Sequence, residues 1–271
     1  MSKIELDKYY TPKSVVEKCV DVLGSIIGVS GVTDVIEPSA GDGAFIESVE
    51  NTFHCGKSYL DIAPESSLVK EQDFLTYNEV YKKGRVIIGN PPFGSRNSLI
   101  IKFFKKSVEL GDYVAFILPI SQLNNTKQLY EFDLIYSEDL GVENYSGVPL
   151  HCCFNVYKRP NNGVLNKKPK TPVINGLDVV EYRRDKEDSY RKKVKEGYFH
   201  SIGSWGNGCV GVTPEYIGKF AMELYFYSEV NVIRHVVQSI DWRQEVKSIS
   251  GKKLPKGLAL EIIKNKLEDG L

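Results

Sequence analysis

The sequence predicts an α/β protein built on a doubly wound, mostly parallel β-sheet. Over roughly the first 160 residues, short apolar runs of strand length alternate with segments of helical periodicity. Two of these runs end in loops rich in glycine or proline, at 37–43 and 90–93. Because strands separated by helices pair in parallel, we expect both loops at the carboxyl edge of the sheet, where ligands bind in this class of fold.

The first predicted element is a helix from Thr11 to Ile27. Thr11 is a suitable N-cap, and Pro12 suits the first helical position. Apolar side chains then recur at helical spacing, at Val15, Val16, Cys19, Val20, Leu23 and Ile27. One face of this helix is therefore expected to be buried.

The following elements are predicted from the same patterns. The predicted strands are 33–37, 58–62, 84–89, 113–118, 134–137 and 152–157, and the predicted helices are 44–49 and 98–109. The Cys152-Cys153 pair falls within the last strand, so both side chains are expected in the core.

Residues 159–172 interrupt the alternation. This segment has three prolines, several lysines and no apolar periodicity, which is typical of a linker or an exposed loop. We predict one domain over 1–159 and, over 160–271, a linker with a small, less regular region. That region contains a glycine-rich stretch at 201–211, an aromatic stretch at 221–227, and helices around 230–240 and after Pro255.

The composition excludes several classes of protein. Hydrophobic residues make up 42% and charged residues 26%, as in ordinary globular proteins. No run of about 18 uncharged apolar residues predicts a membrane span, and the N-terminus lacks the apolar region of a secretory signal. The five cysteines form no CxxC pair. This disfavours a zinc site or a disulfide framework and predicts a reducing, cytoplasmic compartment.

The net charge is zero, but it is unevenly distributed. Residues 157–196 hold twelve basic and six acidic residues, a net charge of +6. The segment is either a stripe that follows nucleic-acid phosphates or a solvated linker with a charged helix. The candidate nucleic-acid-binding residues are Lys167, Lys168, Lys170, Arg183, Arg184, Arg191 and Lys192.

The string Asn90-Pro91-Pro92-Phe93 carries the strongest signal for chemistry. The amino nitrogen of adenine is a poor nucleophile because its lone pair is delocalised into the ring. A catalyst that transfers a methyl group to this nitrogen must therefore place hydrogen-bond acceptors at the two amino protons. The side-chain oxygen of Asn90 and the carbonyl of Pro91 are suitable acceptors, and Phe93 offers a face to an extruded base. The alternative is a proline-rich turn with one buried aromatic side chain.

A second signal is the loop that begins at Glu37 and runs through Gly43. Its glycines permit a tight turn, and the helix that follows presents N–H groups to a ligand. The loop matches neither the dinucleotide fingerprint nor a P-loop. An acidic residue at the strand end suits a methionyl ammonium better than a pyrophosphate. Asp61, which ends the second strand, suits ribose hydroxyls, and Asp73 with Phe74 suits an adenine amino group and ring.

In combination, these motifs resemble those of the amino-methyltransferases that modify adenine in DNA. Residues 9–12 (YYTP) look like their motif X, residues 37–45 like motif I, and NPPF like motif IV. Asp61 resembles the motif II acid, and Asp73-Phe74 resembles motif III. This order is that of the gamma group, in which a C-terminal target-recognition region follows. The resemblance covers residues 9–157, and a looser similarity to bacteriophage-type adenine methylases extends through 148–160.

The resemblance implies a Rossmann-like class I methyltransferase fold with a seven-stranded sheet and S-adenosylmethionine as cofactor. Thr11, with Tyr10 nearby, would hold the methionine carboxylate, and Glu37 with the backbone of 40–43 would hold the amino end. Asp61 would bind the ribose, and Asp73 with Phe74 the adenine. The implied cofactor-binding set is Tyr10, Thr11, Glu37, Ser39, Ala40, Gly41, Gly43, Asp61, Asp73 and Phe74. The implied catalytic set is Asn90, Pro91, Pro92 and Phe93, with no metal.

The expected activity is methyl transfer to N6 of adenine in DNA, with the base extruded from the duplex. RNA adenine, ribosomal guanine N2 and protein glutamine stay as alternatives, because each presents a conjugated amino nitrogen. A further alternative is a non-catalytic, cofactor- or nucleic-acid-binding subunit. The short C-terminal region and the neutral charge leave room for a partner subunit or a homodimer.

Overall fold

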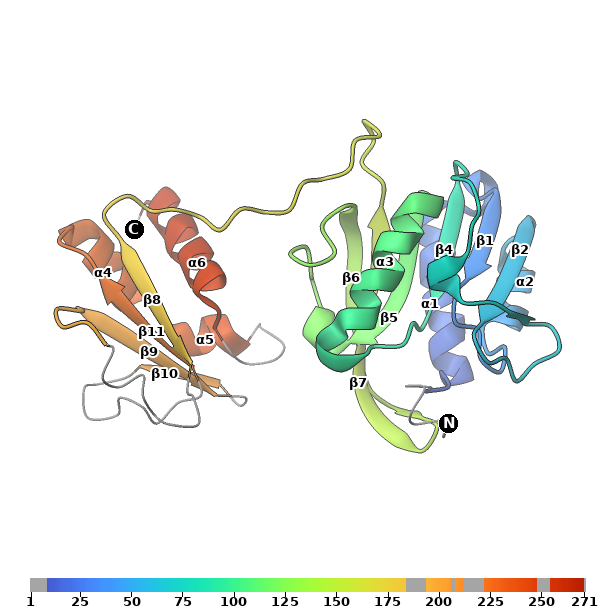
Figure 1. Cartoon of the computed structure of the whole chain (residues 1–271), viewed down its shortest axis with the longest axis horizontal. Helices are drawn as coiled ribbons and strands as arrows, with labels where there is room; N and C mark the ends of the chain where they lie inside the picture. Colours follow the sequence, from blue (N-terminus) through green and yellow to red (C-terminus); the bar gives the residue numbers. More distant parts are fainter. Residues whose placement is uncertain (1–8, 184–193, 206–207, 212–221, 248–253, 271) are drawn as a thin grey trace. The chain divides into compact units, whose positions relative to one another are not determined.

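The computed structural model describes residues 9–183, 194–205, 208–211, 222–247 and 254–270. The chain divides into two compact units, Met1–Pro169 and Lys170–Leu271 (Figure 1). Each unit has its own sheet and its own hydrophobic core.

The first unit is a seven-stranded sheet in the order β3-β2-β1-β4-β5-β7-β6. Its strands are β1 (Asp34–Glu37), β2 (Gly56–Asp61), β3 (Lys70–Glu71), β4 (Arg85–Gly89), β5 (Tyr113–Pro119), β6 (Asp133–Tyr145) and β7 (Val148–Lys158). The first five strands pair in parallel, whereas β7 runs antiparallel to both β5 and β6. The predicted fold class, a doubly wound and mostly parallel sheet, is confirmed.

Helices cover both faces of this sheet (Figure 1). α1 (Lys13–Ile27) and α2 (Ile46–Thr52) pack on one face, and α3 (Ser98–Leu110) packs on the other. Because successive side chains of a strand point to opposite faces, each central strand contributes to both cores. In β7, Cys152 joins the core under α1 and Cys153 joins the core under α3. Both are fully buried, so the predicted core position of this pair is confirmed.

Short 3-10 helices complete the first unit. They are η1 (Val29–Gly31), η2 (Phe74–Thr76), η3 (Ser95–Asn97) and η4 (Ile120–Gln122). The last three lie in the loops that follow β3, β4 and β5, at the carboxyl ends of these strands.

The start of α1 differs from the prediction. The helix begins at Lys13, because Pro12 has an extended backbone with φ −57° and ψ 141°. The carbonyl of Pro12 accepts hydrogen bonds from the amides of Val15 and Val16 and so closes the first turn. Thr11 is therefore not the N-cap, and its hydroxyl is available to the neighbouring loop.

The helix predicted over 44–49 is also displaced, to Ile46–Thr52. Gly41 and Gly43 have positive φ angles of 54° and 90°, which belong to a turn and not to a helix. The amide of Ile46 still bonds to the carbonyl of Gly43, so the helix starts only when this turn is complete.

The last two strands are much longer than the predicted segments 134–137 and 152–157. β6 and β7 form a hairpin with register shifts near Tyr136 and Gly141. The outer part of the hairpin has mostly exposed side chains, so its sequence lacks the apolar pattern that predicts a buried strand. The turn reaches the N-terminal segment, where the amide of Tyr10 donates to the hydroxyl of Ser146 at 2.8 Å.

The second unit contains a four-stranded antiparallel sheet in the order β10-β9-β11-β8. Its elements are β8 (Asp178–Arg183), β9 (His200–Trp205), β10 (Gly208–Gly211), β11 (Met222–Tyr227), α4 (Asn231–Ser239), α5 (Trp242–Lys247) and α6 (Lys256–Glu268). Ile202, Leu224 and Phe226 pack against the helices. The expectation of a less regular region was wrong, because strands such as HSIGSW carry too few aliphatic residues to show a periodicity.

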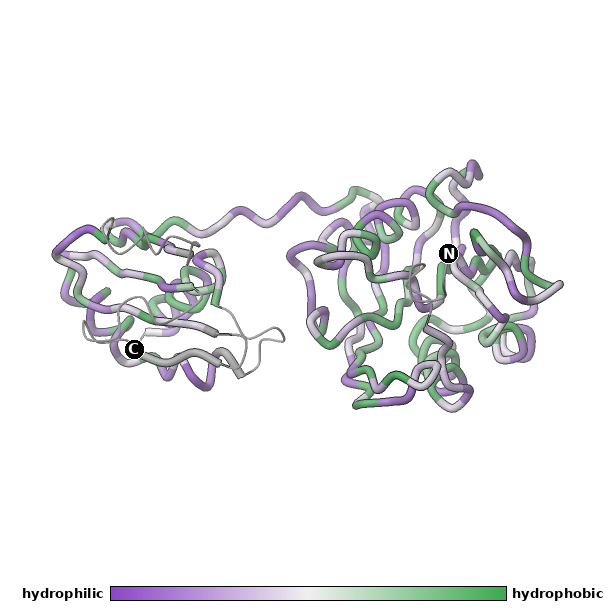
Figure 2. The backbone as a smooth tube through the Cα atoms, turned by 60° about the horizontal axis from the view of Figure 1, so that its bottom comes forward, coloured by the Kyte–Doolittle hydropathy of each residue, from purple (hydrophilic) through white to green (hydrophobic). Residues whose placement is uncertain are grey.

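Residues 159–177, between β7 and β8, form no helix or strand. Figure 2 shows much of this segment in the hydrophilic colour. No helix in the described part of the chain is both long and apolar enough to cross a membrane.

Candidate active site

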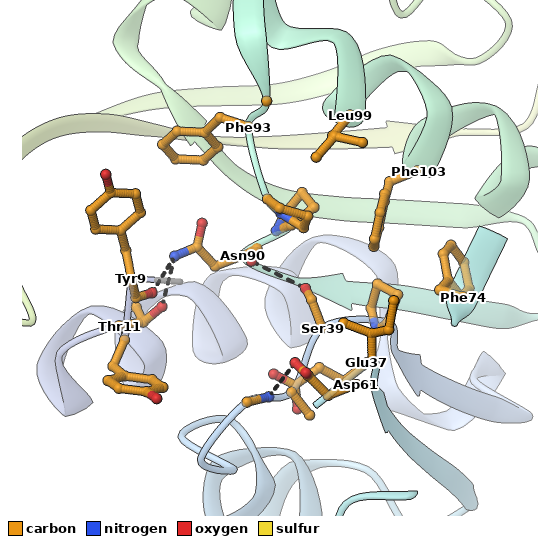
Figure 3. Close-up of a pocket in the computed structure, with 18 of the residues that line it drawn as sticks. Tyr9, Thr11, Glu37, Ser39, Asp61, Phe74, Asn90, Phe93, Leu99 and Phe103 are labelled. Carbon is orange, nitrogen blue, oxygen red and sulfur yellow. Dashed lines mark hydrogen bonds between the residues drawn. The ribbon is translucent and has the colours of Figure 1, made fainter. Parts of the chain in front are cut away.

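A cavity of about 780 Å³ opens at the carboxyl edge of the larger sheet. The polar residues of the cavity lie at, or directly after, the ends of the sheet's strands. Glu37 ends β1, Asp61 ends β2, and Asn90 follows β4. Because β1 and β4 are neighbours, their loops meet, and the hydroxyl of Ser39 donates to the backbone carbonyl of Asn90 at 3.1 Å (Figure 3). The 37–43 and 90–93 loops therefore face one cavity.

Most of the predicted site residues line this cavity. They are Tyr10, Thr11, Glu37, Ser39, Ala40, Gly41, Asp61, Asp73, Phe74, Asn90, Pro91, Pro92 and Phe93. Gly43 does not line it. Its φ of 90° is a left-handed conformation that other residues rarely adopt, so Gly43 serves the turn.

The side chain of Asn90 has a fixed orientation. Its amide nitrogen lies 3.2 Å from the carbonyl oxygen of Tyr9 and 3.2 Å from the hydroxyl of Thr11. A carbonyl can only accept, so the nitrogen must face it and the side-chain oxygen must face away. That oxygen is buried and has no hydrogen-bond partner. Figure 3 shows it on the side of the Tyr9 and Phe93 rings.

Glu37 is buried at the floor of the cavity, with 1% of its surface exposed. Its Oε2 atom also has no hydrogen-bond partner. Burial raises the pKa of Glu37 well above its ordinary value, and the nearby carboxyl groups of Asp42 and Asp61 raise it further. A cationic hydrogen-bond donor at Oε2 would lower the pKa of Glu37 again, because it would stabilise the charged carboxylate.

Asp61 binds the backbone on both sides of the cavity floor. One carboxylate oxygen accepts from the amide of Gly41 at 2.9 Å, and the other accepts from the amide of Ala63 at 2.8 Å. These bonds hold the 37–43 loop against the end of β2. A carboxylate accepts hydrogen bonds only, which is the chemistry that the hydroxyls of a ribose require.

Tyr10 closes the cavity from the N-terminal segment. Its hydroxyl donates to the carboxylate of Glu65. Its ring packs over Gly41, where a Cβ would lie 3.3 Å from the ring. A side chain at position 41 would therefore push the ring of Tyr10 away.

The far end of the cavity is formed by Asp73, Phe74 and Ile62. One carboxylate oxygen of Asp73 caps η2 by accepting from the amide of Leu75 at 2.8 Å. Phe74 is buried, and its ring lies 5.3 Å from the ring of Phe103. Ile62 is 58% exposed, which leaves an apolar side chain at the cavity rim. This end suits a flat, weakly polar ring.

Several lining residues escaped the sequence analysis. They include Tyr9, Ile62, Leu75, Leu99, Phe103, Pro119 and Leu150. Ile62 directly follows Asp61, and Tyr9 belongs to the YYTP string, so sequence position could have indicated both. Leu150 comes from the β6–β7 hairpin, and only the tertiary structure brings it to the cavity.

The predicted nucleic-acid-binding residues are only partly described. Lys167, Lys168 and Lys170 are exposed. Arg183 ends β8, and Arg184, Arg191 and Lys192 lie outside the described residues. Within the described residues, no group of three His, Cys, Asp or Glu side chains could hold a metal ion.

No family model and no curated protein matches the sequence. Solved structures are similar at low identity. A putative RNA methyltransferase from Pyrococcus horikoshii is 16% identical, with a TM-score of 0.47 over 59% of this chain and 90% of the other. A putative class I S-adenosylmethionine-dependent methyltransferase from Listeria monocytogenes is 12% identical, with a TM-score of 0.46 over 59% of this chain and 63% of the other.

A third similar structure is the magnesium protoporphyrin IX methyltransferase from Synechocystis with bound S-adenosylmethionine. It is 9% identical, with a TM-score of 0.39 over 55% of this chain and 79% of the other. Similarities this distant say nothing about the substrate of this chain. The strand order and the antiparallel β7 within a parallel sheet are themselves those of the class I methyltransferase fold.

Proposed function

We propose that this chain binds S-adenosylmethionine and methylates the exocyclic N6 amino group of adenine in DNA. The observation that carries the proposal is the buried, unpartnered side-chain oxygen of Asn90, held in place by Tyr9 and Thr11. An unsatisfied buried polar atom costs about 1–3 kcal/mol, so it marks a place where a ligand donor belongs.

The residues around Glu37 fit the cofactor. Five buried side-chain atoms in the described residues have no hydrogen-bond partner, and two of them, Glu37 Oε2 and Asn90 Oδ1, belong to this cavity. Glu37 would receive the ammonium of the methionyl group, and the Thr11 hydroxyl would donate to its carboxylate. Asp61 would accept from the ribose hydroxyls. Asp73, Phe74 and Ile62 would hold the adenine.

Bound S-adenosylmethionine supplies an electrophilic methyl group on its sulfonium. The chain's own residues prepare the amino nitrogen that attacks it. Asn90 Oδ1 would accept a hydrogen bond from one amino N–H, and the carbonyl of Pro91 would accept one from the other. The single proton that the methylated nitrogen loses would pass to solvent. Two acceptors in these positions draw the nitrogen toward a tetrahedral geometry and free its lone pair. Phe93 would stack on the base, which must leave the duplex to reach this depth.

Tritium transfer from labelled S-adenosylmethionine tests the proposal. Purified chain is incubated with unmethylated duplex DNA, with total RNA or with protein, and the labelled product is digested and identified. We expect label in N6-methyladenine from DNA. Label found only in RNA or only in protein would show that this is the substrate and that DNA is not. A chain that binds the cofactor but labels nothing would be a binding subunit.

Methylation-sensitive sequencing of DNA from cells that express the chain then locates the modified base. An Asn90→Ala chain expressed in the same way is the control, and it should leave the DNA unmodified. The sequence around each modified adenine also defines the duplex oligonucleotides for kinetic measurements.

A further inference from the structure

Tyr9 lies beside the proposed base site and belongs to the YYTP string that precedes α1. Its backbone carbonyl accepts from the side chain of Asn90, and the next residue, Tyr10, is bonded to the hairpin through Ser146. These two contacts hold the Tyr9 backbone between β4 and the β6–β7 hairpin. The Tyr9 side chain makes neither of them, so its ring can be replaced without loss of the anchor.

The ring of Tyr9 faces the ring of Phe93. The ring centroids are 6.5 Å apart, and the ring planes differ by 23°. Two stacking contacts of about 3.5 Å each require about 7 Å between the outer rings. The centroid distance of 6.5 Å is the upper limit of the gap between the two ring planes, so the rings must move slightly apart to take a base. Both rings are partly buried and line the same cavity.

The free acceptor of the site lies on the side of these rings. Figure 3 shows the side-chain oxygen of Asn90 on the side of the Phe93 ring, while its nitrogen points to the backbone carbonyl of Tyr9 and the hydroxyl of Thr11. A flat ring between the two aromatics could thus present an edge amino group to Asn90 Oδ1. A carboxamide such as that of glutamine could meet the same oxygen but would cover little of either aromatic face.

We propose that Tyr9 and Phe93 form a two-sided aromatic slot that takes the target nucleobase, with Tyr9 as its second wall. The inference rests on the proposed function and specifies its substrate as a planar heteroaromatic ring held on both faces. Tyr9 acts by positioning the base, and the amino group is handled by Asn90. A single wall would let the base tilt away from the acceptor.

The test compares Tyr9→Leu and Tyr9→Phe with the wild-type chain. Substrates are the duplex located by sequencing and the same duplex with 2-aminopurine at the methylated adenine. Because stacking on an aromatic side chain contributes about 1–3 kcal/mol per base, kcat/KM for DNA should fall roughly 5- to 100-fold in Tyr9→Leu. Tyr9→Phe should stay near wild type, and the cofactor Kd should be unchanged in both.

The fluorescence of 2-aminopurine reports base stacking, and a purely structural role of Tyr9 would leave this fluorescence unchanged. In Tyr9→Leu the extruded 2-aminopurine should fluoresce more strongly than in wild type, because one quenching ring is gone. Tyr81→Leu is the matched control, since Tyr81 is 47% exposed and pairs with Asp112 at the opposite end of the sheet. It should change neither kinetics nor fluorescence.

The outcomes separate the two proposals. An active wild-type chain with an equally active Tyr9→Leu variant overturns the slot and leaves the proposed function intact. Loss of cofactor affinity in a folded Tyr9→Leu variant also overturns it, since Tyr9 would then serve the cofactor. A wild-type chain that methylates no nucleic acid overturns the proposed function and the slot together.

Discussion

The side-chain nitrogen of Asn90 lies 3.2 Å from the hydroxyl oxygen of Thr11, and this contact joins the two halves of the cavity. Thr11 precedes α1, whereas Asn90 follows β4. The hydroxyl accepts from Asn90 and keeps its own proton to donate. A carboxylate bound by Thr11 would therefore also fix the direction of the Asn90 acceptor. We expect cofactor binding and base binding to be coupled through this pair.

Asn90→Ala should strongly reduce methyl transfer. The substitution removes the acceptor for the amino proton, and loss of one such positioned group lowers kcat by roughly 100- to 1,000-fold in comparable sites. Because the bond to Thr11 is also lost, cofactor affinity should weaken by roughly 2- to 10-fold. Tritium transfer and calorimetric titration measure the two effects. Full activity in this variant would show that the proposed chemistry is incorrect.

Thr11→Val should weaken cofactor binding while the protein stays folded. Valine has nearly the shape of threonine but cannot donate to a carboxylate. Hydrogen bonds to charged groups contribute about 1.5–3 kcal/mol, which predicts a Kd roughly 10- to 100-fold higher. Thr11→Ser keeps the hydroxyl and is the matched control. Equal Kd values for the valine and serine variants would remove Thr11 from the cofactor site.

Cofactor binding should release a proton from Glu37. The pKa of this buried carboxyl lies well above its ordinary value of 4.5 in the free protein. An ammonium placed against it favours the charged form, so binding lowers that pKa. Calorimetry in two buffers of different ionisation enthalpy measures the released proton. Glu37→Gln should bind more weakly and release none; Glu47→Gln, at an exposed position, should behave as wild type.

Glu37 should also make the free protein less stable as the pH rises. Between 4.5 and the raised pKa, the unfolded chain has lost this proton while the folded chain keeps it. Stability therefore falls as the pH rises through this window. Thermal unfolding between pH 5 and 8 should show a smaller decrease in Tm for Glu37→Gln than for wild type. A parallel decrease in both proteins would contradict the assigned cause.

The exposed lysines of the connecting segment should contribute to DNA affinity without setting its specificity. Replacing Lys167, Lys168 and Lys170 by Gln should reduce the slope of log K against log salt by about 0.9 for each lysine that neutralises a phosphate. Lys82 and Lys83, exposed before β4, provide a matched double variant that should leave the slope unchanged. An unchanged slope in the triple variant would remove this segment from the interface.

The sequence by itself determined the fold class of the first unit and most of its cavity. Buried parallel strands are continuous apolar runs, so β4 and β5 could be recognised directly. Parallel strands also end at one edge, which is why Glu37, Asp61 and Asn90 could be grouped before the structure was known. These are local patterns, and they follow from the strand-to-helix alternation alone.

The tertiary structure decided what depends on contacts between distant residues. Only the approach of the N-terminal segment to β4 orients the Asn90 amide, and only the ring spacing gives Tyr9 a role. The second sheet was missed because β9 brings few aliphatic side chains to its core, and because in β11 Tyr225 is buried together with Leu224 and Phe226, so neither strand shows a clear alternation of apolar and polar residues. Such features depend on contacts between residues that are far apart in the sequence. No local sequence pattern indicates which of these residues come into contact.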